Sequence, residues 1–322
     1  MSCSIEPKIV VLGGGTGMPV LLRGLKKYPI ELSTIVTVAD DGGSTGRLRK
    51  DIEIPAPGDI RNVIAALSNV DAELKELFQH RFQVSNGLSG HSLGNLVLVA
   101  MNALTGDFYS AVKKVSDLFQ VKGNIYPIVN ESVTLHAEMD DGMIVSGESN
   151  IPMKNKKIKR VFLTPNNLEP MPKVVQAILE ADIIVISPGS LYTSILPNLI
   201  IADVVKALND TKAKVVYVCN VMTQDGETNN YHASDHVQAI YNHIGPNTID
   251  SIIVHNQPIP EATLQLYARQ HSAPVIYQKE NLLQLGLQVM EEDIIDHSQT
   301  VIRHNTNKIA KLLYDLAINK KR

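Results

Sequence analysis

The sequence predicts an α/β protein in which helices cover both faces of a mostly parallel sheet, a Rossmann-like three-layer fold. Apolar, β-branched runs alternate along the chain with stretches of helical periodicity. These apolar runs are continuous, as in strands buried on both faces, and the first leads directly into a glycine-rich turn. The 322 residues, 44% of them hydrophobic, can bury a large core. We therefore expect one doubly wound domain over residues 1–322.

The first half of the chain supplies two strands and a helical segment. The strands are expected at residues 8–12 and 33–39, with a helix between them that packs through Val20, Leu21, Gly24 and Leu25. Residues 59–120 are expected to be mostly helical. Two sets of apolar residues recur there at helical spacing: Ile60, Val63, Ile64 and Leu67, and then Leu93, Leu96, Val97 and Ala100.

The second half begins with a strand-like segment, residues 125–148, in which Asp140-Asp141-Gly142 has the composition of a hairpin turn. This predicts a small β-hairpin insertion over about 131–150. The α/β alternation is expected to resume with a strand at 160–163. Further strands are expected at 182–187, 215–219 and 251–254, and helices from about 173, at about 195–209, at 235–243, after Pro260 and at the C-terminus, where Ile309, Leu312, Leu313 and Leu316 share a face.

Composition excludes several classes of function. A formal charge of −3 gives no electrostatic reason to expect nucleic acid as a partner, and the basic run 154–160 is expected to be a solvated loop. Cys3 and Cys219 cannot form a disulfide framework or a zinc site, and Cys219 is expected in the core. We find neither a signal-peptide pattern nor an apolar stretch of the roughly 18–20 residues that a membrane helix needs. A cytoplasmic protein is expected.

The strongest candidate site is the turn Gly13-Gly14-Gly15-Thr16-Gly17. Glycines let a ligand phosphate approach the backbone closely, and the following helix N-terminus offers unpaired N–H donors and a positive dipole. A tight turn that needs glycine only for its dihedral angles is the alternative. The dinucleotide fingerprint fails at Met18, and no Lys-Ser/Thr pair follows as in a Walker A loop.

A second loop follows the second strand and contains Asp40, Asp41, Ser44 and Thr45. An aspartate here, together with Asp59, could bind a ribose hydroxyl or Mg²⁺ near a phosphate, or the aspartates could simply cap a turn. Residues 42–46 also match the G-x-S-x-G pattern of a nucleophile elbow. The adjacent carboxylates would repel a developing oxyanion, which disfavours a hydrolase.

Two further polar motifs lie in the predicted helical segment. In the first, Asp59 is a natural helix N-cap, and Arg61, next to Asn62, would need an anionic ligand or a neighbouring carboxylate to offset its unfavourable place in a first turn. In the second, His91 and Asn95 are four residues apart and are expected on one helix face. His91 could serve as acid, base or phosphate donor, or equally as a capping or packing residue.

Two more loops follow later strands. Gly189, Ser190, Tyr192 and Thr193 suit a second phosphate or sugar hydroxyls, or else an ordinary capped helix start. The loop from 220 to 228 contains Asn220, Thr223 and Glu227, which could bind a base or a sugar edge. Loops at the carboxyl ends of parallel strands meet in one crevice. We therefore expect these segments to share a site.

Taken together, the motifs resemble the CofD-like superfamily, and within it the YvcK branch of UPF0052-type gluconeogenesis factors. The resemblance spans nearly the whole chain: VLGGGTG at 11–17, VADDGGSTGRLR at 38–49, PGDIRN at 57–62, GHSLGN at 90–95, SPGSLYTSI at 187–195 and MTQDGET at 222–228. Six motifs in order are far more specific than one glycine loop. One departure is Asp225, where the family pattern leads us to expect proline.

The resemblance implies binding of a nucleotide sugar of the UDP-N-acetylglucosamine kind. It also implies a regulatory, non-catalytic role in cell shape and cell-wall supply during gluconeogenic growth, exerted through protein partners. Self-association into a homo-oligomer stays open. The CofD branch instead transfers a phospholactyl group from a guanine-nucleotide donor with Mg²⁺. By that analogy, Asp41 and Asp59 would hold Mg²⁺ and His91 would join them as a catalytic residue.

Overall fold

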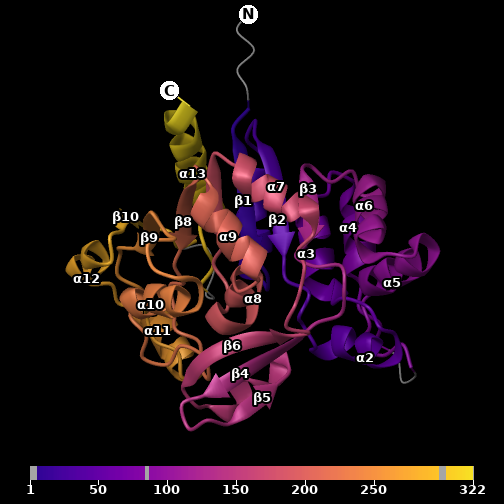
Figure 1. The fold of residues 1–322 in the computed structure, drawn as a ribbon, viewed down its shortest axis with the longest axis horizontal. Coiled ribbons are helices and arrows are strands. Elements are labelled where there is room, and N and C mark those ends of the chain that lie inside the picture. The colour runs from indigo at the N-terminus through magenta and orange to yellow at the C-terminus, as the bar shows by residue number, and fades with distance from the viewer. Residues whose placement is uncertain (1–5, 84–86, 297–301, 322) are drawn as a thin grey trace, which may run out of the picture.

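The computed structural model describes residues 6–83, 87–296 and 302–321. Its centre is a seven-stranded sheet in the order β10-β9-β8-β7-β1-β2-β3, and every neighbouring pair is parallel (Figure 1). The strands are β1 (Lys8–Gly13), β2 (Glu31–Val36), β3 (Asn124–Pro127), β7 (Ile183–Ile186), β8 (Lys214–Val218), β9 (Ser251–His255) and β10 (Gln288–Glu292). The predicted fold class is confirmed. No strand was predicted at β10.

Helices cover the sheet on both sides. On one side α1 (Gly17–Leu25) packs against α3 (Pro57–Leu67) and α13 (Thr306–Lys321). On the other, α7 (Pro172–Glu180) packs against α9 (Ala202–Asp210), and Figure 1 shows both in front of the strands. Because both faces are covered, β7 is buried along its whole length, which explains its continuous apolar sequence.

The helical segment between β2 and β3 contains α2 (Gly43–Asp51), α3, α4 (Ala72–Gln79), α5 (Leu93–Thr105) and α6 (Phe108–Leu118). The predicted packing face of α3 is buried. The predicted face of α5 is wrong, because Ala100 is exposed and the buried residues are Gly94, Asn95 and Leu98. Since α5 is apolar on most of its circumference, periodicity could not identify the side that packs.

A separate three-stranded antiparallel sheet, in the order β5-β4-β6, forms an insertion between β3 and α7. It comprises β4 (Thr134–Met139), β5 (Ile144–Ser146) and β6 (Ile158–Thr164), with short helices η1 (Glu148–Asn150) and η2 (Pro152–Lys154) between β5 and β6. Residues 140–142 form the predicted hairpin turn. The prediction that 160–163 returns to the main sheet was wrong. The alternating burial of β6 suits a sheet with one buried face.

The basic run 154–160 is likewise only partly a loop, because its end lies in β6. There Lys159 and Arg160 both pair with Glu138 on β4, each at 2.6 Å.

The single helix predicted at 195–209 is three elements. A π-helical turn, η3 (Leu191–Ile195), leads into α8 (Leu196–Leu199), and α9 follows at an angle of 74°. The remaining helices are α10 (Ala233–Ile244), α11 (Glu261–Ala268) and α12 (Lys279–Gln284). Across the described ranges no single helix is long and apolar enough to cross a membrane, and only that bent pair meets the criterion by length and composition.

The order in which the chain adds strands to the sheet reverses between β1 and β7. The chain runs from β1 to β2 and β3 on one side and then returns to β7 on the other, which makes this the crevice where ligands bind in open α/β sheets. The insertion lies across the end of the sheet opposite the chain termini (Figure 1). Cys219, at the end of β8, is buried as predicted, whereas Cys3 lies outside the described residues.

Candidate functional site

The glycine turn joins β1 to the N-terminus of α1 and packs against the turn that follows β7. Gly15 has a φ of +66°, and a Cβ on Gly17 would lie 2.2 Å from the carbonyl oxygen of Pro188. Thr16, the N-cap of α1, makes no side-chain capping bond, and the first turn contains no acidic residue. The turn therefore leaves backbone N–H donors at the helix start, the arrangement that binds anions.

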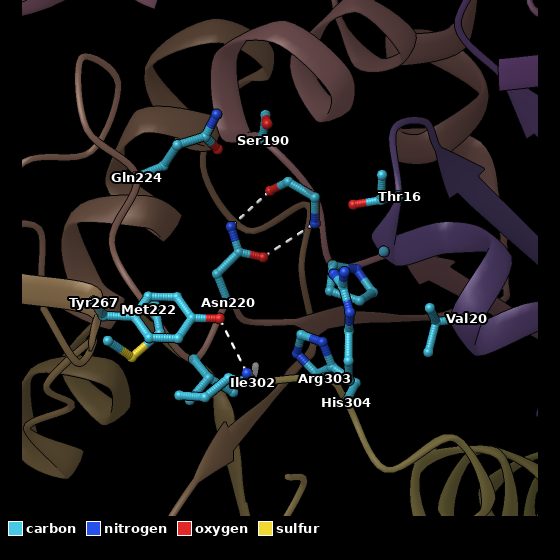
Figure 2. Close-up of a pocket in the computed structure, with 14 residues that line it drawn as sticks. Thr16, Val20, Ser190, Asn220, Met222, Gln224, Tyr267, Ile302, Arg303 and His304 are labelled. Atoms are coloured by element: carbon cyan, nitrogen blue, oxygen red, sulfur yellow. Dashed lines mark hydrogen bonds between the residues drawn. The ribbon is translucent and has the colours of Figure 1, made fainter. Parts of the chain in front are cut away.

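A cavity of about 190 Å³ opens beside this turn. Figure 2 shows Thr16 and Val20 on one wall, with Ser190, Gln224, Met222 and Tyr267 around the others. Asn220 fixes two of the contributing loops together: its Oδ1 accepts from Gly189 N (3.0 Å) and its Nδ2 donates to Gly189 O (2.7 Å). Loops after β1, β7 and β8 thus meet at one cavity, as expected for these three segments, whereas the predicted segments 40–46, 57–62 and 90–95 do not line it.

Residues near the C-terminus complete the cavity. Arg303 lines it, and its backbone oxygen accepts from Asp296 N (2.8 Å). Next to it, Ile302 N donates to the hydroxyl of Tyr267 on the neighbouring α11 (3.0 Å, Figure 2). Burial lowers the pKa of His304 to about 4, so His304 is neutral at pH 7 and Arg303 provides the positive charge of the cavity. Neither Arg303 nor Tyr267 was found from the sequence, because neither belongs to a glycine-rich or hydroxyl-rich motif.

Asp59 lies on the other side of the glycine turn. Its Oδ2 accepts from Gly15 N (2.7 Å). The prediction that Asp59 caps α3 was wrong, because Ala56 is the N-cap and Asp59 lies inside the first turn. Burial raises the pKa of Asp59 to about 6, although the Gly15 N–H and the charge of Arg61 act in the opposite direction. Arg61 is buried, which lowers the pKa of its guanidinium, and the charges of Asp59 and Asp40 oppose this shift, so carboxylates lie near it as its position required.

The aspartate pair after β2 has two different roles. Asp40 Oδ1 accepts from Gly42 N (2.8 Å), which is the turn-capping contact that the sequence left open. Asp41 Oδ1 accepts from Ser149 N (2.9 Å) on η1 and so joins this loop to the insertion. A Cβ on Gly58 would lie 2.7 Å from both Asp40 Oδ2 and Thr45 Oγ1, so the loop packs tightly on the start of α3.

Glu148 on η1 adds a carboxyl group to this side. Burial raises its pKa to about 8, and the charges of Asp40, Asp59, Glu227 and Asp41 raise it further. We call Asp40, Asp59 and Glu148 the acidic compartment. No motif in the sequence pointed to Glu148, which reaches the crevice only because the insertion folds over it. Within the described part of the chain, no three His, Cys, Asp or Glu residues are arranged to hold a metal ion.

Ser44, His91 and Asn95 form a hydrogen-bonded group. Ser44 Oγ lies 3.1 Å from His91 Nδ1 and accepts from Asn95 Nδ2 (3.2 Å). His91 precedes α5, so the prediction that it shares a helix face with Asn95 was wrong; they meet because both reach Ser44. Ser44 lies in the first turn of α2 and is 4% exposed, so no exposed nucleophile elbow forms here.

The remaining predicted residues lie behind the cavity or beside it. Glu227 is buried and accepts from Tyr192 N (3.1 Å) and Thr193 Oγ1 (2.9 Å). Thr223 Oγ1 accepts from Ala273 N (2.9 Å). Asn62 Oδ1 accepts from Arg61 (2.7 Å). Five of the predicted ligand residues line the cavity: Thr16, Gly17, Gly189, Ser190 and Asn220.

The family model described as 2-phospho-L-lactate transferase CofD matches residues 9–295. The gluconeogenesis factor of Bacillus subtilis (strain 168) is 53% identical over 311 residues, which cover 97% of this chain and 98% of that protein. That of Halalkalibacterium halodurans is 51% identical over 310 residues, 96% of each. A crystal structure of a UPF0052-family protein from Bacillus halodurans has a TM-score of 0.94 and 50% identity, and covers 96% of this chain and 99% of its own.

These matches extend over nearly the entire chain, the glycine turn included. The protein belongs to the CofD family. Its curated relatives are named gluconeogenesis factors, so the branch that the sequence motifs resembled is confirmed.

Proposed function

We propose that the protein binds a nucleotide sugar of the UDP-N-acetylglucosamine kind in the cavity beside the glycine turn, and that it acts as a regulator. The observation that carries the proposal is the joining of three anion-binding features in one cavity: the open N-terminus of α1, the Pro188–Ser190 turn and the guanidinium of Arg303. Helix N-termini and arginine are the groups that proteins use for phosphates.

The other walls suit the rest of such a ligand. Tyr267, Met222 and Ile302 offer an aromatic and apolar surface for a base, while Ser190 and Gln224 offer polar groups for sugar hydroxyls. Larger cavities of about 460, 420 and 360 Å³ lie along β6 and α10, but none of them includes the glycine turn. We therefore place the ligand in the smaller cavity, because its lining includes the glycine turn and Arg303. This cavity would hold the diphosphate and its flanking groups.

The proposed regulatory role includes cell shape and cell-wall supply during growth on gluconeogenic carbon, in the cytoplasm and through protein partners. It is supported by the names of the relatives, gluconeogenesis factors. It is also supported by His91, the candidate acid or base, which is buried against Ser44 and does not line the cavity.

A transferase is the second candidate, because a carboxylate directly contacts the phosphate-binding turn. Asp59 accepts from Gly15 N, and Asp41 lies close enough to the acidic compartment for its charge, like those of Asp40 and Asp59, to raise the pKa of Glu148. The matching family model is described as a phospholactate transferase. In this reading Asp59 and Asp41 would hold Mg²⁺, which would neutralise charge on a transferring phosphate.

Incubation with UDP- and GDP-linked donors and Mg²⁺, with calorimetry in parallel, tests the proposal. We expect saturable binding of UDP-N-acetylglucosamine without release of nucleotide. Catalysed release that Asp59→Asn abolishes, and that Asp51→Asn on the exposed part of α2 leaves intact, would overturn the regulator in favour of the transferase.

A further inference from the structure

Glu227 is a buried carboxylate that does not line the cavity. It nevertheless hydrogen-bonds to two segments that do, the loop that contains Gln224 and the turn that begins after Ser190. It lies in the loop between β8 and α10 and is 4% exposed. Its Oε1 accepts from Thr193 Oγ1 (2.9 Å) and from Gln224 Nε2 (3.0 Å), and its Oε2 accepts from Tyr192 N (3.1 Å). All three neighbours donate, so the ionised carboxylate matches its surroundings.

Gln224 is the first of these connections. It lines the cavity, and its side-chain amide donates to Glu227. Its backbone N–H is fixed as well, because it donates to Thr228 Oγ1 (2.9 Å). Glu227 therefore determines how the Gln224 amide is presented to a ligand.

The second connection runs through η3, the π-helical turn that begins just after Ser190. The carbonyl oxygen of Ser190 accepts from both Ser194 N (2.9 Å) and Ile195 N (3.0 Å), which are the α-helical and π-helical bonds respectively. This turn therefore has two hydrogen-bonding patterns available. Glu227 holds its first residues, Tyr192 and Thr193, while Ser190 lines the cavity.

We propose that Glu227 is a positioning residue for the nucleotide-sugar cavity, and that its ionised carboxylate holds the Gln224 amide and the first turn of η3 in the ligand-binding arrangement. This inference rests on the proposed function. Protonation adds an O–H donor to this group, so either the Thr193 hydroxyl turns to accept from it or one of the contacts to the carboxyl is lost. The affinity for a nucleotide sugar then falls on protonation of Glu227.

Several charged groups surround Glu227. Glu148 on η1 is close enough for the Glu227 charge to affect its pKa, as is Tyr192 on η3. Tyr231, Asp235, Lys156 and Lys157 line the neighbouring cavity that Glu227 also borders. Burial raises the pKa of Glu227 to about 7, and hydrogen bonds from Thr193 and Tyr192 oppose the shift. The expected change in affinity therefore falls close to neutral pH.

Calorimetric titration of the full chain with UDP-N-acetylglucosamine between about pH 6 and pH 8.5 tests this inference. We expect the wild-type affinity to fall by about tenfold or more towards the lower pH, the effect of losing one hydrogen bond to a charged group. Glu227→Gln places an N–H₂ group among the donors and should bind at all pH values as weakly as the wild type does at pH 6. Glu148→Gln is the matched control and should retain the wild-type fall.

A double-mutant cycle tests whether Glu227 affects ligand affinity through Gln224. If Glu227 acts through Gln224, adding Glu227→Gln to Gln224→Ala should cost less affinity than Glu227→Gln alone. Thr193→Val keeps the carboxylate and removes one donor, so it should move the pH midpoint upward even if Glu227→Gln folds poorly. A wild-type affinity that does not change with pH, or full affinity in Glu227→Gln, overturns this inference alone. Failure of the wild type to bind at any pH overturns the proposed function as well.

Discussion

The two sides of the glycine turn differ in charge although they share one stretch of backbone. On the side of β7 and β8, the cavity contains Arg303, the start of α1 and uncharged polar groups. On the side of β2, the acidic compartment brings together Asp40, Asp59 and Glu148, and the pKa of Asp59 is raised to about 6 and that of Glu148 to about 8. An anionic ligand is therefore attracted to one side and repelled from the other.

This difference shows how one turn can serve two chemistries. Two like charges about 4 Å apart near a protein surface repel by about 4 kcal/mol, so ionised carboxylates in the acidic compartment disfavour a diphosphate there unless a cation binds as well. The same carboxylates would become useful if a divalent cation bound there. Under the proposed function, the occupancy of the β2 side by a cation, rather than the glycines, would distinguish a transferase from a binding protein.

Removal of the cavity's cation should have the largest effect on binding. Arg303→Ala should weaken binding of UDP-N-acetylglucosamine by about 1.5–3 kcal/mol, the range for hydrogen bonds to charged groups. Calorimetry at low and high salt checks this, since the loss should shrink as salt screens the pair. Arg23→Ala, an exposed arginine elsewhere on α1, is the control. Equal affinity in the two variants would show that the ligand does not bind in this cavity.

Neutralisation of the acidic compartment should change stability rather than binding. The pKa of Glu148 is raised from 4.5 to about 8, so the folded state binds more protons and the free energy of unfolding falls as pH rises through this window. Glu148→Gln should remove that slope and be more stable than the wild type at pH 9 by on the order of 1–3 kcal/mol. Denaturant titrations at pH 5 and pH 9 measure the difference.

The control for this change lies on the same insertion. Glu138 pairs with Lys159 and Arg160, which hold the pKa of its carboxyl below its usual value. Glu138→Gln should therefore bring no gain at pH 9. If Glu148→Gln raised the free energy of unfolding equally at pH 5 and pH 9, the ionised Glu148 carboxylate would not be what destabilises the wild type.

The smallest effect is expected for the Ser44 group, which supports the acidic side without contacting the cavity. Ser44→Ala leaves both His91 and Asn95 without that partner and should cost about 1–2 kcal/mol of stability, with unchanged affinity. Ser146→Ala removes an exposed hydroxyl bonded to His136 (2.9 Å) and should cost much less. Weaker ligand binding in Ser44→Ala would show that the two sides are coupled through α2.

The sequence by itself determined the fold class and the position of the glycine turn, because both depend on local pattern. Buried parallel strands need continuous apolar runs, and a backbone that passes close to Pro188 needs Gly17. The same logic predicted Ser190 and Asn220, which follow strands directly and so reach the edge of the sheet where the strands end.

Only the tertiary structure decided which side of that turn has a cation beside it and which side has carboxylates. Arg303, Tyr267 and Glu148 belong to segments without a local motif, and they reach the crevice because α11, residues 302–304 and the insertion lie against it. The pairing of β6 with β4 and the buried face of α5 were also decided by what lay opposite them. Local sequence specifies which backbone conformations a segment favours, whereas charge and burial depend on neighbours that are distant in the chain.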